Sequence, residues 1–138
     1  MSEPVSSSTP SSRRPMAWLW VFAGDAILVL VFATIGRASH ERGLSVLGVL
    51  ETAWPFLAAL VVGWIALRAW SAPMAVIRTG LPLWGITVAG GMALRALSGA
   101  GVALPFVIVA AATLLLLLVV WRLVAGLVAR SRSRRLTR

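Results

Sequence analysis

The chain has 138 residues, of which 59% are hydrophobic and 12% are charged, and its formal net charge is +9. This composition is typical of an integral membrane protein, and four spans with short loops fill the length, which excludes an additional soluble catalytic domain. The absence of cysteine excludes disulfides, thiol nucleophiles and thiolate metal sites.

The first apolar segment follows a polar amino-terminal stretch. Residues 1–15 contain Ser, Thr and Pro with no apolar periodicity, which predicts a disordered tail. Residues 16–36 carry no charge except that of Asp25, and Trp18 and Trp20 near their start suit a membrane–water interface. About 20 apolar residues are needed to cross a bilayer, so this segment is predicted to be the first span.

The second predicted span covers about residues 51–70. Its start is open to a second interpretation, because Leu44, Leu47 and Leu50 recur at helical spacing before Glu51. A helix that begins near Leu44 carries Glu51 about 10 Å inward, at 1.5 Å per residue. Glu51 is then a second acid inside the membrane.

Two further spans complete the predicted bundle. The third covers about residues 79–96 and is rich in glycine, which lets neighbouring backbones approach closely. We therefore expect it inside the bundle, with helix contacts at Gly85, Gly90 and Gly91. The fourth covers about residues 101–121 and contains the uniformly apolar run 114–118, which predicts an outer wall against lipid. The predicted transmembrane domain is thus residues 16–124.

The arginines predict the orientation of the bundle. With four spans, ten of the 13 basic residues, including Arg122 and all that follow it, fall on the side of the termini, and only Arg37, Arg42 and Arg95 fall on the other. Basic segments stay in the cytoplasm, so both termini are predicted to be cytoplasmic. Residues 125–138 form a basic tail expected to contact anionic lipids through Arg130, Arg132, Arg134, Arg135 and Arg138. Without a folded module or interleaved aromatic residues, nucleic-acid binding is not expected.

Asp25 is the first candidate functional residue. It lies about 14 Å from the start of its span, near the predicted midplane, and no other charge is clearly at its depth. Arg37 is too far along the same helix to pair with it, so a partner must come from another helix, another subunit or a proton. Desolvation disfavours a charged carboxylate, which makes Asp25 a candidate proton carrier. One alternative is a structural hydrogen bond between helices, to Thr87 or to a backbone carbonyl freed by a proline. Another is exposure of Asp25 to water in a different register of the helix.

A second group of polar residues is predicted on the external side. It consists of Arg37, His40, Glu51 and Arg95. If the second span starts near Leu44, Pro55, which has no N–H, leaves the Glu51 carbonyl without its helical donor, and this favours a polar pocket there. Glu51 is expected to pair with Arg95 or Arg37, and His40 can change its charge near neutral pH. The alternative is a solvated loop with interfacial charges, and a lone histidine near two acids does not predict a metal site.

No pattern in the sequence predicts catalysis. Gly-x-Ser-x-Gly, HExxH, a phosphate-binding loop and CxxC are all absent, and a single histidine leaves little scope for a nucleophile and its base. The sequence therefore predicts neither an enzyme nor a bound cofactor.

Several short motifs resemble a known family. They are Gly24-Asp25, Ile35-Gly36-Arg37-x-Ser39-His40, Thr52-Ala53-Trp54-Pro55-Phe56, Gly63-Trp64 and the arginine that closes the third span, Arg95. Over about residues 17–121 the chain resembles an uncharacterised bacterial and archaeal family of four-span membrane proteins, domain of unknown function 3054. The resemblance implies an all-α bundle of four transmembrane helices in a prokaryotic plasma membrane, and it implies no activity.

Two hypotheses on function follow. In the first, a homo-oligomer permits permeation of a small solute or proton, with Asp25 in the path and the external polar group as the entry site. In the second, the protein is a non-catalytic scaffold or accessory subunit, and Asp25 and the glycines contact a partner membrane protein.

Overall fold

The computed structural model describes residues 16–38 and 43–136. Within these residues all regular structure is helical, and four helices are long and apolar enough to cross a membrane. The prediction of four spans is thereby confirmed. The first two spans are α1 (Ala17–Ala38) and α2 (Val46–Ala66), followed by the short turn η1 (Ala69–Ser71). The third combines η2 (Val76–Gly80) with α3 (Leu81–Leu97), and the fourth combines α4 (Leu104–Leu115), η3 (Leu116–Val120) and α5 (Trp121–Leu136).

The second span begins earlier than residue 51. The Ser45 side chain accepts a hydrogen bond of 3.1 Å from the Gly48 N–H and caps the first turn of α2. Glu51 consequently lies in the second turn of the helix, as in the alternative start near Leu44. The helix ends at Ala66, and Arg68 then adopts a left-handed conformation with φ 48° that turns the chain.

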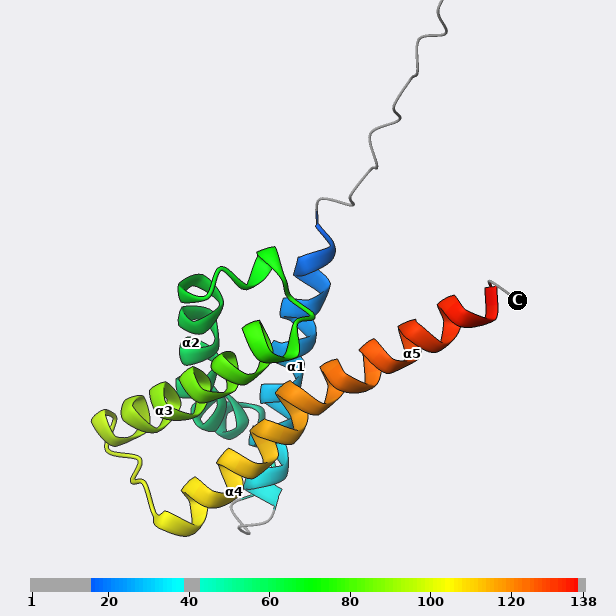
Figure 1. Cartoon of the computed structure of the whole chain (residues 1–138). Coiled ribbons are helices and arrows are strands. Elements are labelled where there is room, and N and C mark those ends of the chain that lie inside the picture. Colours follow the sequence, from blue (N-terminus) through cyan, green and yellow to red (C-terminus); the bar gives the residue numbers. More distant parts are fainter. Residues whose placement is uncertain (1–15, 39–42, 137–138) are drawn as a thin grey trace, which may run out of the picture.

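The helix that contains the fourth span continues beyond residue 121, where that span was predicted to end. Leu104–Leu136 form one helical segment of 33 residues, about 50 Å long at 1.5 Å per residue. Residues 125–136, predicted as part of a tail, are therefore a helical extension of the last span. Figure 1 shows α5 running outward from the rest of the bundle.

The second span, rather than the third, is the most enclosed helix. Of 18 consecutive residues in α2, 39% are buried, against 22% in each of the other three spans. The fourth span is also less lipid-facing than predicted, because Leu114 and Leu118 are fully buried while Leu116 between them is exposed. The errors share one cause, since apolar and glycine content do not indicate which face of a helix turns inward.

Two glycines of α3 lie against α2. A Cβ atom on Gly90 would stand 2.9 Å from the Ala59 Cβ, and one on Gly91 would meet the Phe56 ring. These glycines therefore allow the close approach of α2 and α3, the most extensively packed pair of helices. Gly85 differs, because no heavy atom lies within 4 Å of a Cβ placed there. The predicted contact at Gly85 is not made within the described part of this chain.

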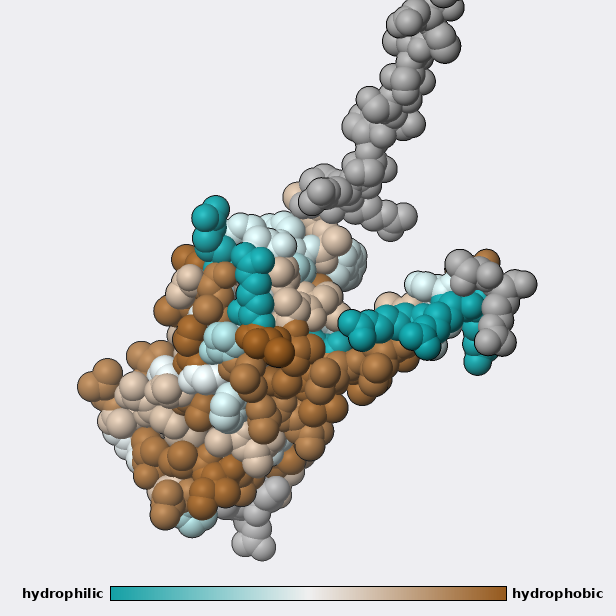
Figure 2. Space-filling model, viewed as in Figure 1, coloured by the Kyte–Doolittle hydropathy of each residue, from teal (hydrophilic) through white to brown (hydrophobic). Residues whose placement is uncertain are grey.

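The outer surface of the bundle is apolar. In Figure 2 hydrophobic residues cover most of the visible face, and hydrophilic residues follow the outer part of α5. Exposed side chains such as Ile27, Val62 and Ile108 are suited to lipid tails. Charged side chains buried beneath such a surface therefore need partners from the protein itself.

Candidate functional site

Asp25 forms a buried ion pair with Arg122. The Arg122 guanidinium donates from Nη2 to Oδ2 at 2.6 Å and from Nη1 to Oδ1 at 2.9 Å. Both side chains have 0% exposure. This two-point geometry matches a planar guanidinium to a planar carboxylate, and it is among the stronger arrangements of charged groups in proteins.

Two tryptophans complete the environment of this carboxylate. Trp64 Nε1 donates to Oδ2 at 3.1 Å, and Trp121 Nε1 donates to Oδ1 at 3.2 Å. With the two bonds from Arg122, the Asp25 carboxylate accepts four hydrogen bonds, which fills its usual capacity. We refer to these four residues as the Asp25 site. It links α1, α2 and the fourth span.

The arginine of the Asp25 site is held on its other side by the backbone. Arg122 Nη1 also donates to the Leu118 carbonyl at 2.6 Å, and Nε donates to the Pro73 carbonyl at 2.9 Å. Leu118 belongs to η3, whose wide turn directly precedes Trp121 and Arg122. Such turns alter the register of a helix locally and are often found at functional sites. Here the turn precedes two consecutive residues that both reach Asp25.

The predicted structural partners of Asp25 are replaced by Arg122. Arg122 was predicted among the cytoplasmic arginines, but the structure buries it against the first span. Thr87 is buried, but its hydroxyl forms no hydrogen bond with the described residues. Asp25 is therefore paired with a fixed cation from another helix, one of the sources that the sequence left open.

The Asp25 site lies toward one end of the bundle. Pro73 belongs to the connection between α2 and α3, and its carbonyl contacts Arg122 directly. Arg122 is also about 27 Å along the fourth span from Leu104, at 1.5 Å per residue. Asp25 consequently lies nearer the end that carries the termini than the predicted midplane position implies.

A cavity of about 360 Å³ lies at the opposite end of the bundle. We call it the end cavity. It is formed where α1 and α3 end and where α2 and α4 begin. Its lining residues are Gly36, Arg37, Glu51, Thr52, Arg95, Ala100, Gly101, Ala103 and Phe106. Three of the four residues in the predicted external polar group are thus brought together, and the fourth, His40, lies outside the described residues.

Arg95 is held in place within the end cavity. Its Nε donates to the Gly101 carbonyl at 3.3 Å, and its Nη2 donates to the Ala100 carbonyl at 3.2 Å. The guanidinium carbon also lies 4.4 Å from the centre of the Phe106 ring, a favourable cation–π distance. These contacts fix the orientation of the Arg95 guanidinium.

Arg37 approaches the cavity from the end of α1. Its Nη2 donates to the Gly43 carbonyl at 3.4 Å. Its guanidinium also lies against Gly48 of α2, where a Cβ atom would collide with it. The absence of a side chain at residue 48 thus makes room for Arg37 beside the cavity.

Glu51 contributes a carboxylate to the cavity without the predicted ion pair. Among residues 16–38 and 43–136, Asp25 and Arg122 form the one ion pair within 4.0 Å. Glu51 is exposed and lines the same cavity as Arg37 and Arg95, but neither arginine is within that distance of its carboxylate. The predicted pair of Glu51 with Arg37 or Arg95 is therefore wrong for this structure.

An apolar layer separates the two polar sites. The ring of Phe32 lies 5.1 Å from that of Phe56, and the Phe106 ring is 6.4 Å from each of them. Beyond these rings Val29 and Leu60 are fully buried. This layer forms an aromatic floor below the end cavity. The described residues of a single chain therefore provide no continuous polar route from the cavity to Asp25.

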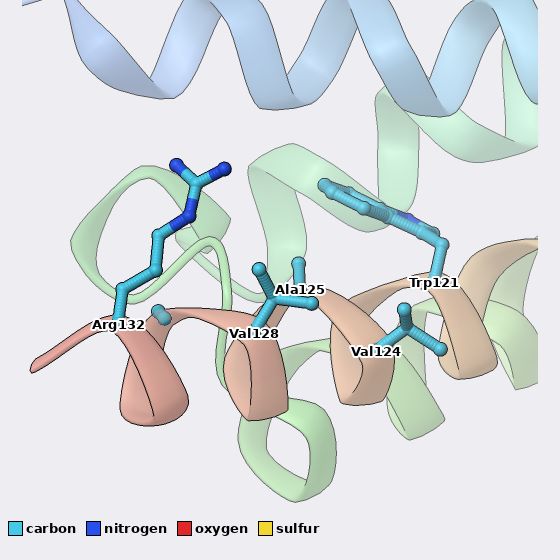
Figure 3. Close-up of a pocket in the computed structure, with 6 residues that line it drawn as sticks. Trp121, Val124, Ala125, Val128 and Arg132 are labelled. Atoms are coloured by element: carbon cyan, nitrogen blue, oxygen red, sulfur yellow. The ribbon is translucent and has the colours of Figure 1, made fainter. Parts of the chain in front are cut away.

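A shallow groove of about 580 Å³ follows α5. Its lining residues are Trp121, Val124, Ala125, Val128, Ala129 and Arg132. Figure 3 shows Trp121 and Arg132 pointing to the same side of α5, with apolar side chains between them. The groove is thus apolar along its length and basic at its outer end.

Sequence reasoning did not identify Arg122, Trp64 or Trp121 as partners of Asp25. One available signal was that Trp121 and Arg122 end a long uncharged stretch, at the same end of the bundle as the first half of α1. Thr52 and Phe106 were also missed, because side chains of these types are frequent in membrane helices for packing alone.

The comparisons with known proteins identify one family. Residues 22–125 match the family described as proteins of unknown function, DUF3054. No curated protein and no solved structure matches the chain.

Proposed function

The chain belongs to the DUF3054 family, and from the geometry of the end cavity we propose that it is a membrane protein that binds a small carboxylate-bearing solute. The observation that carries the proposal is the convergence of Arg37, Glu51 and Arg95, from three different helices, on one cavity of about 360 Å³. The proposed role is recognition of the solute, and it involves no catalysed reaction.

The chemistry of the cavity favours this solute class. Ligand cavities range from about 300 to 1,000 Å³, so the end cavity is large enough for a small organic molecule. A guanidinium presents its donors in a planar fork that matches a carboxylate. Two arginines and one glutamate line the cavity, and guanidinium groups attract an anionic ligand more than a cationic one.

The proposed solute is recognised at the outer end of the protein. An excess of arginine on the side of the termini supports cytoplasmic termini in a prokaryotic plasma membrane, which makes the end cavity external. The α5 groove, with Arg132 at its outer end, and the nearby Arg130, Arg134 and Arg135 support contact with anionic lipids of the cytoplasmic leaflet. Arg138 lies outside the described residues.

We propose that the bound solute crosses the membrane at an interface between copies of the chain. The apolar layer below the cavity gives no support to a path through a single bundle. It also gives no support to Asp25 as a member of that path, because this carboxylate is enclosed by Arg122 and two tryptophans. A homo-oligomer supplies the additional surfaces that such a path requires.

The second candidate function is that of a scaffold or accessory subunit in a membrane complex. It is favoured by the Asp25 site, which joins three spans through four hydrogen bonds. Such an arrangement is typical of contacts that hold helices together. The scaffold proposal predicts no dependence on solutes. Binding measurements therefore separate the two proposals.

The test is ligand binding by protein in lipid nanodiscs. Thermal stability and calorimetry are measured with acetate, 4-methylpentanoate and 3-phenylpropionate, and with the corresponding neutral amides. We expect at least one acid to bind and to raise the melting temperature, since a ligand that binds only the folded state stabilises it. The amides should not bind. Arg95→Gln should weaken binding of the acid by about tenfold or more, the effect of losing a charge-assisted hydrogen bond.

Arg78→Gln is the matched control. Arg78 is exposed and lies in η2, away from the end cavity, so this variant should bind the acids like the wild type. The proposal is wrong if no acid binds at millimolar concentration, or if Arg78→Gln weakens binding as much as Arg95→Gln does.

A further inference from the structure

We propose that the α5 groove binds one anionic phospholipid, with an acyl tail along the groove and the phosphate at Arg132. The groove is lined by residues of α5 and lies apart from the end cavity, so this inference does not depend on the proposed function. It also goes beyond a general attraction between the basic tail and a charged membrane, because it assigns one lipid molecule to one place.

The length of the groove matches one leaflet of a bilayer. Its two ends, Trp121 and Arg132, are about 16 Å apart along the helix, at 1.5 Å per residue. One leaflet provides half of a hydrocarbon core that is about 30 Å thick. A lipid tail that begins beside Arg132 can therefore lie along the whole groove.

The wall of the groove is apolar up to its outer end. Val124 and Val128 are 53% and 46% exposed, and Ala125 and Ala129 place small side chains beside them. This part of α5 extends outward from the rest of the bundle in Figure 1. An exposed apolar surface of this kind is typical of a membrane contact, and hydrocarbon is its matching neighbour.

The inner end of the groove is a fixed surface. Trp121 Nε1 donates to the Asp25 carboxylate at 3.2 Å, and the Arg122 guanidinium carbon lies 5.1 Å from the centre of the Trp121 ring. These contacts hold the indole in one position. A tail that reaches Trp121 therefore contacts a member of the Asp25 site, and its binding should stabilise the folded protein.

The outer end of the groove carries the charge that an anionic headgroup needs. Arg132 is exposed, and its planar guanidinium presents N–H donors in a fork that matches phosphate oxygens. Arg135 follows at a spacing of three residues, which places it beside Arg132 on the helix surface. Arg130 projects from nearly the opposite side, because two residues turn a helix by about 200°. Only part of the basic tail thus adjoins the groove.

A second copy of the chain matches the groove less well than a lipid does. Copies that share one orientation in the membrane bring their α5 helices together in parallel, which places two Arg132 guanidinium groups side by side. Like charges in such a contact repel each other. An anionic lipid instead provides a phosphate for the arginine and a tail for the apolar wall.

The test is native mass spectrometry of the full-length protein in an uncharged detergent. Phosphatidylglycerol and phosphatidylcholine with identical tails are titrated in parallel. We expect one phosphatidylglycerol per chain to bind about tenfold or more tightly than phosphatidylcholine, as for one charge-assisted hydrogen bond. This lipid should also raise the melting temperature. Inorganic phosphate should neither raise the melting temperature nor displace the lipid.

Two matched pairs of variants assign the lipid to the groove. Arg132→Gln should weaken phosphatidylglycerol binding by about tenfold, and Arg130→Gln, which removes the same charge outside the groove, by less than about twofold. Val128→Trp fills the groove and should also weaken binding by about tenfold. Leu127→Trp adds the same bulk at an exposed position outside the groove and should bind the lipid like the wild type. Monodisperse elution from a sizing column verifies that each variant is folded.

Each contrary result overturns the inference in a different way. Equal binding of the two lipids, or equal losses in Arg132→Gln and Arg130→Gln, would indicate a diffuse attraction between the tail and the membrane. Displacement of the lipid by inorganic phosphate would identify a site for a free anion. Unchanged lipid binding in Val128→Trp would place the tail elsewhere. A change in the number of chains per complex in that variant would identify a second copy as the occupant.

Discussion

Arg122 and Asp25 lie 97 residues apart in the chain, and the Nη2 atom of the arginine donates to the Oδ2 atom of the aspartate at 2.6 Å. The pair joins the first span to the last. Because both side chains are fully buried, each supplies the counter-charge that the other needs. The surrounding apolar residues cannot provide it. The stability of the bundle should therefore depend on the two residues jointly.

Removal of one member of this pair should destabilise the protein strongly. Arg122→Met leaves the Asp25 carboxylate buried without its cation, and Asp25→Leu leaves the reverse defect. We expect each change to lower the free energy of unfolding by about 3–5 kcal/mol, the usual cost of breaking a buried ion pair. The measurement is unfolding by sodium dodecyl sulfate in mixed micelles, followed by tryptophan fluorescence.

The double variant, Asp25→Leu with Arg122→Met, is the control for that prediction. It replaces both charges with apolar groups and should recover most of the lost stability, because such replacements are often neutral. If the double variant instead loses the sum of the two single effects, to within about 0.5 kcal/mol, the residues act independently and the prediction is wrong.

The tryptophans of the Asp25 site should contribute through their indole N–H groups. Trp121→Phe and Trp64→Phe each remove one hydrogen bond to the carboxylate and keep an aromatic ring. We expect a loss of about 1.5–3 kcal/mol for each, the range for hydrogen bonds to charged groups. Trp20→Phe is the matched control, because Trp20 is 82% exposed, and it should change stability by less than about 0.5 kcal/mol. Equal losses in all three variants would contradict a specific role for the N–H groups.

The glycines of α3 should differ in their tolerance of a methyl group. Gly90→Ala and Gly91→Ala place a Cβ atom against Ala59 and Phe56, and overpacking of this kind costs about 1–3 kcal/mol. Gly85→Ala meets no atom within 4 Å, so it should be neutral or stabilise the helix by up to about 1 kcal/mol. Unfolding of the three variants under the same conditions tests the contrast, which fails if Gly85→Ala is the most damaging.

The orientation of the chain can be tested with single cysteines. The natural sequence contains no cysteine, and Ser71 and Ser98 are exposed residues in connections at opposite ends of the bundle. For cytoplasmic termini, a membrane-impermeant maleimide should label Ser98→Cys in intact cells and Ser71→Cys only after permeabilisation. The reversed pattern of labelling would place the termini outside and would make the end cavity cytoplasmic.

The spans could be predicted from the sequence because hydropathy acts over whole segments. The wrong assignments concern faces and partners. Gly85 resembles Gly90 and Gly91 in sequence, yet only the latter two face α2. The periodicity of one helix does not indicate which neighbour it meets, so the central position of α2 could not be derived from composition.

The two polar sites were predictable to different degrees. Arg37, Glu51 and Arg95 lie near the ends of spans on one side of the bundle, so the number of spans is enough to predict that they are close. It does not predict that Glu51 stays more than 4.0 Å from the arginines. Asp25 was identifiable as a lone acid in an apolar span. Its partner was not, because an arginine at the end of the last span also fits the general excess of positive charge beside a membrane. Only the tertiary arrangement distinguishes a buried cation from an interfacial one.

The long separation between Asp25 and Arg122 has a consequence for biogenesis. At roughly 5–20 residues per second, the ribosome adds Arg122 about 5–20 s after Asp25, so the first span meets the membrane before its counter-ion exists. A carboxylate inside an inserting helix costs up to about 3 kcal/mol, and this penalty is relieved only when the last span arrives. A chain that stops before residue 122 keeps an uncompensated acid in its first span, so the arrival of the final helix completes the charge pairing inside the bundle.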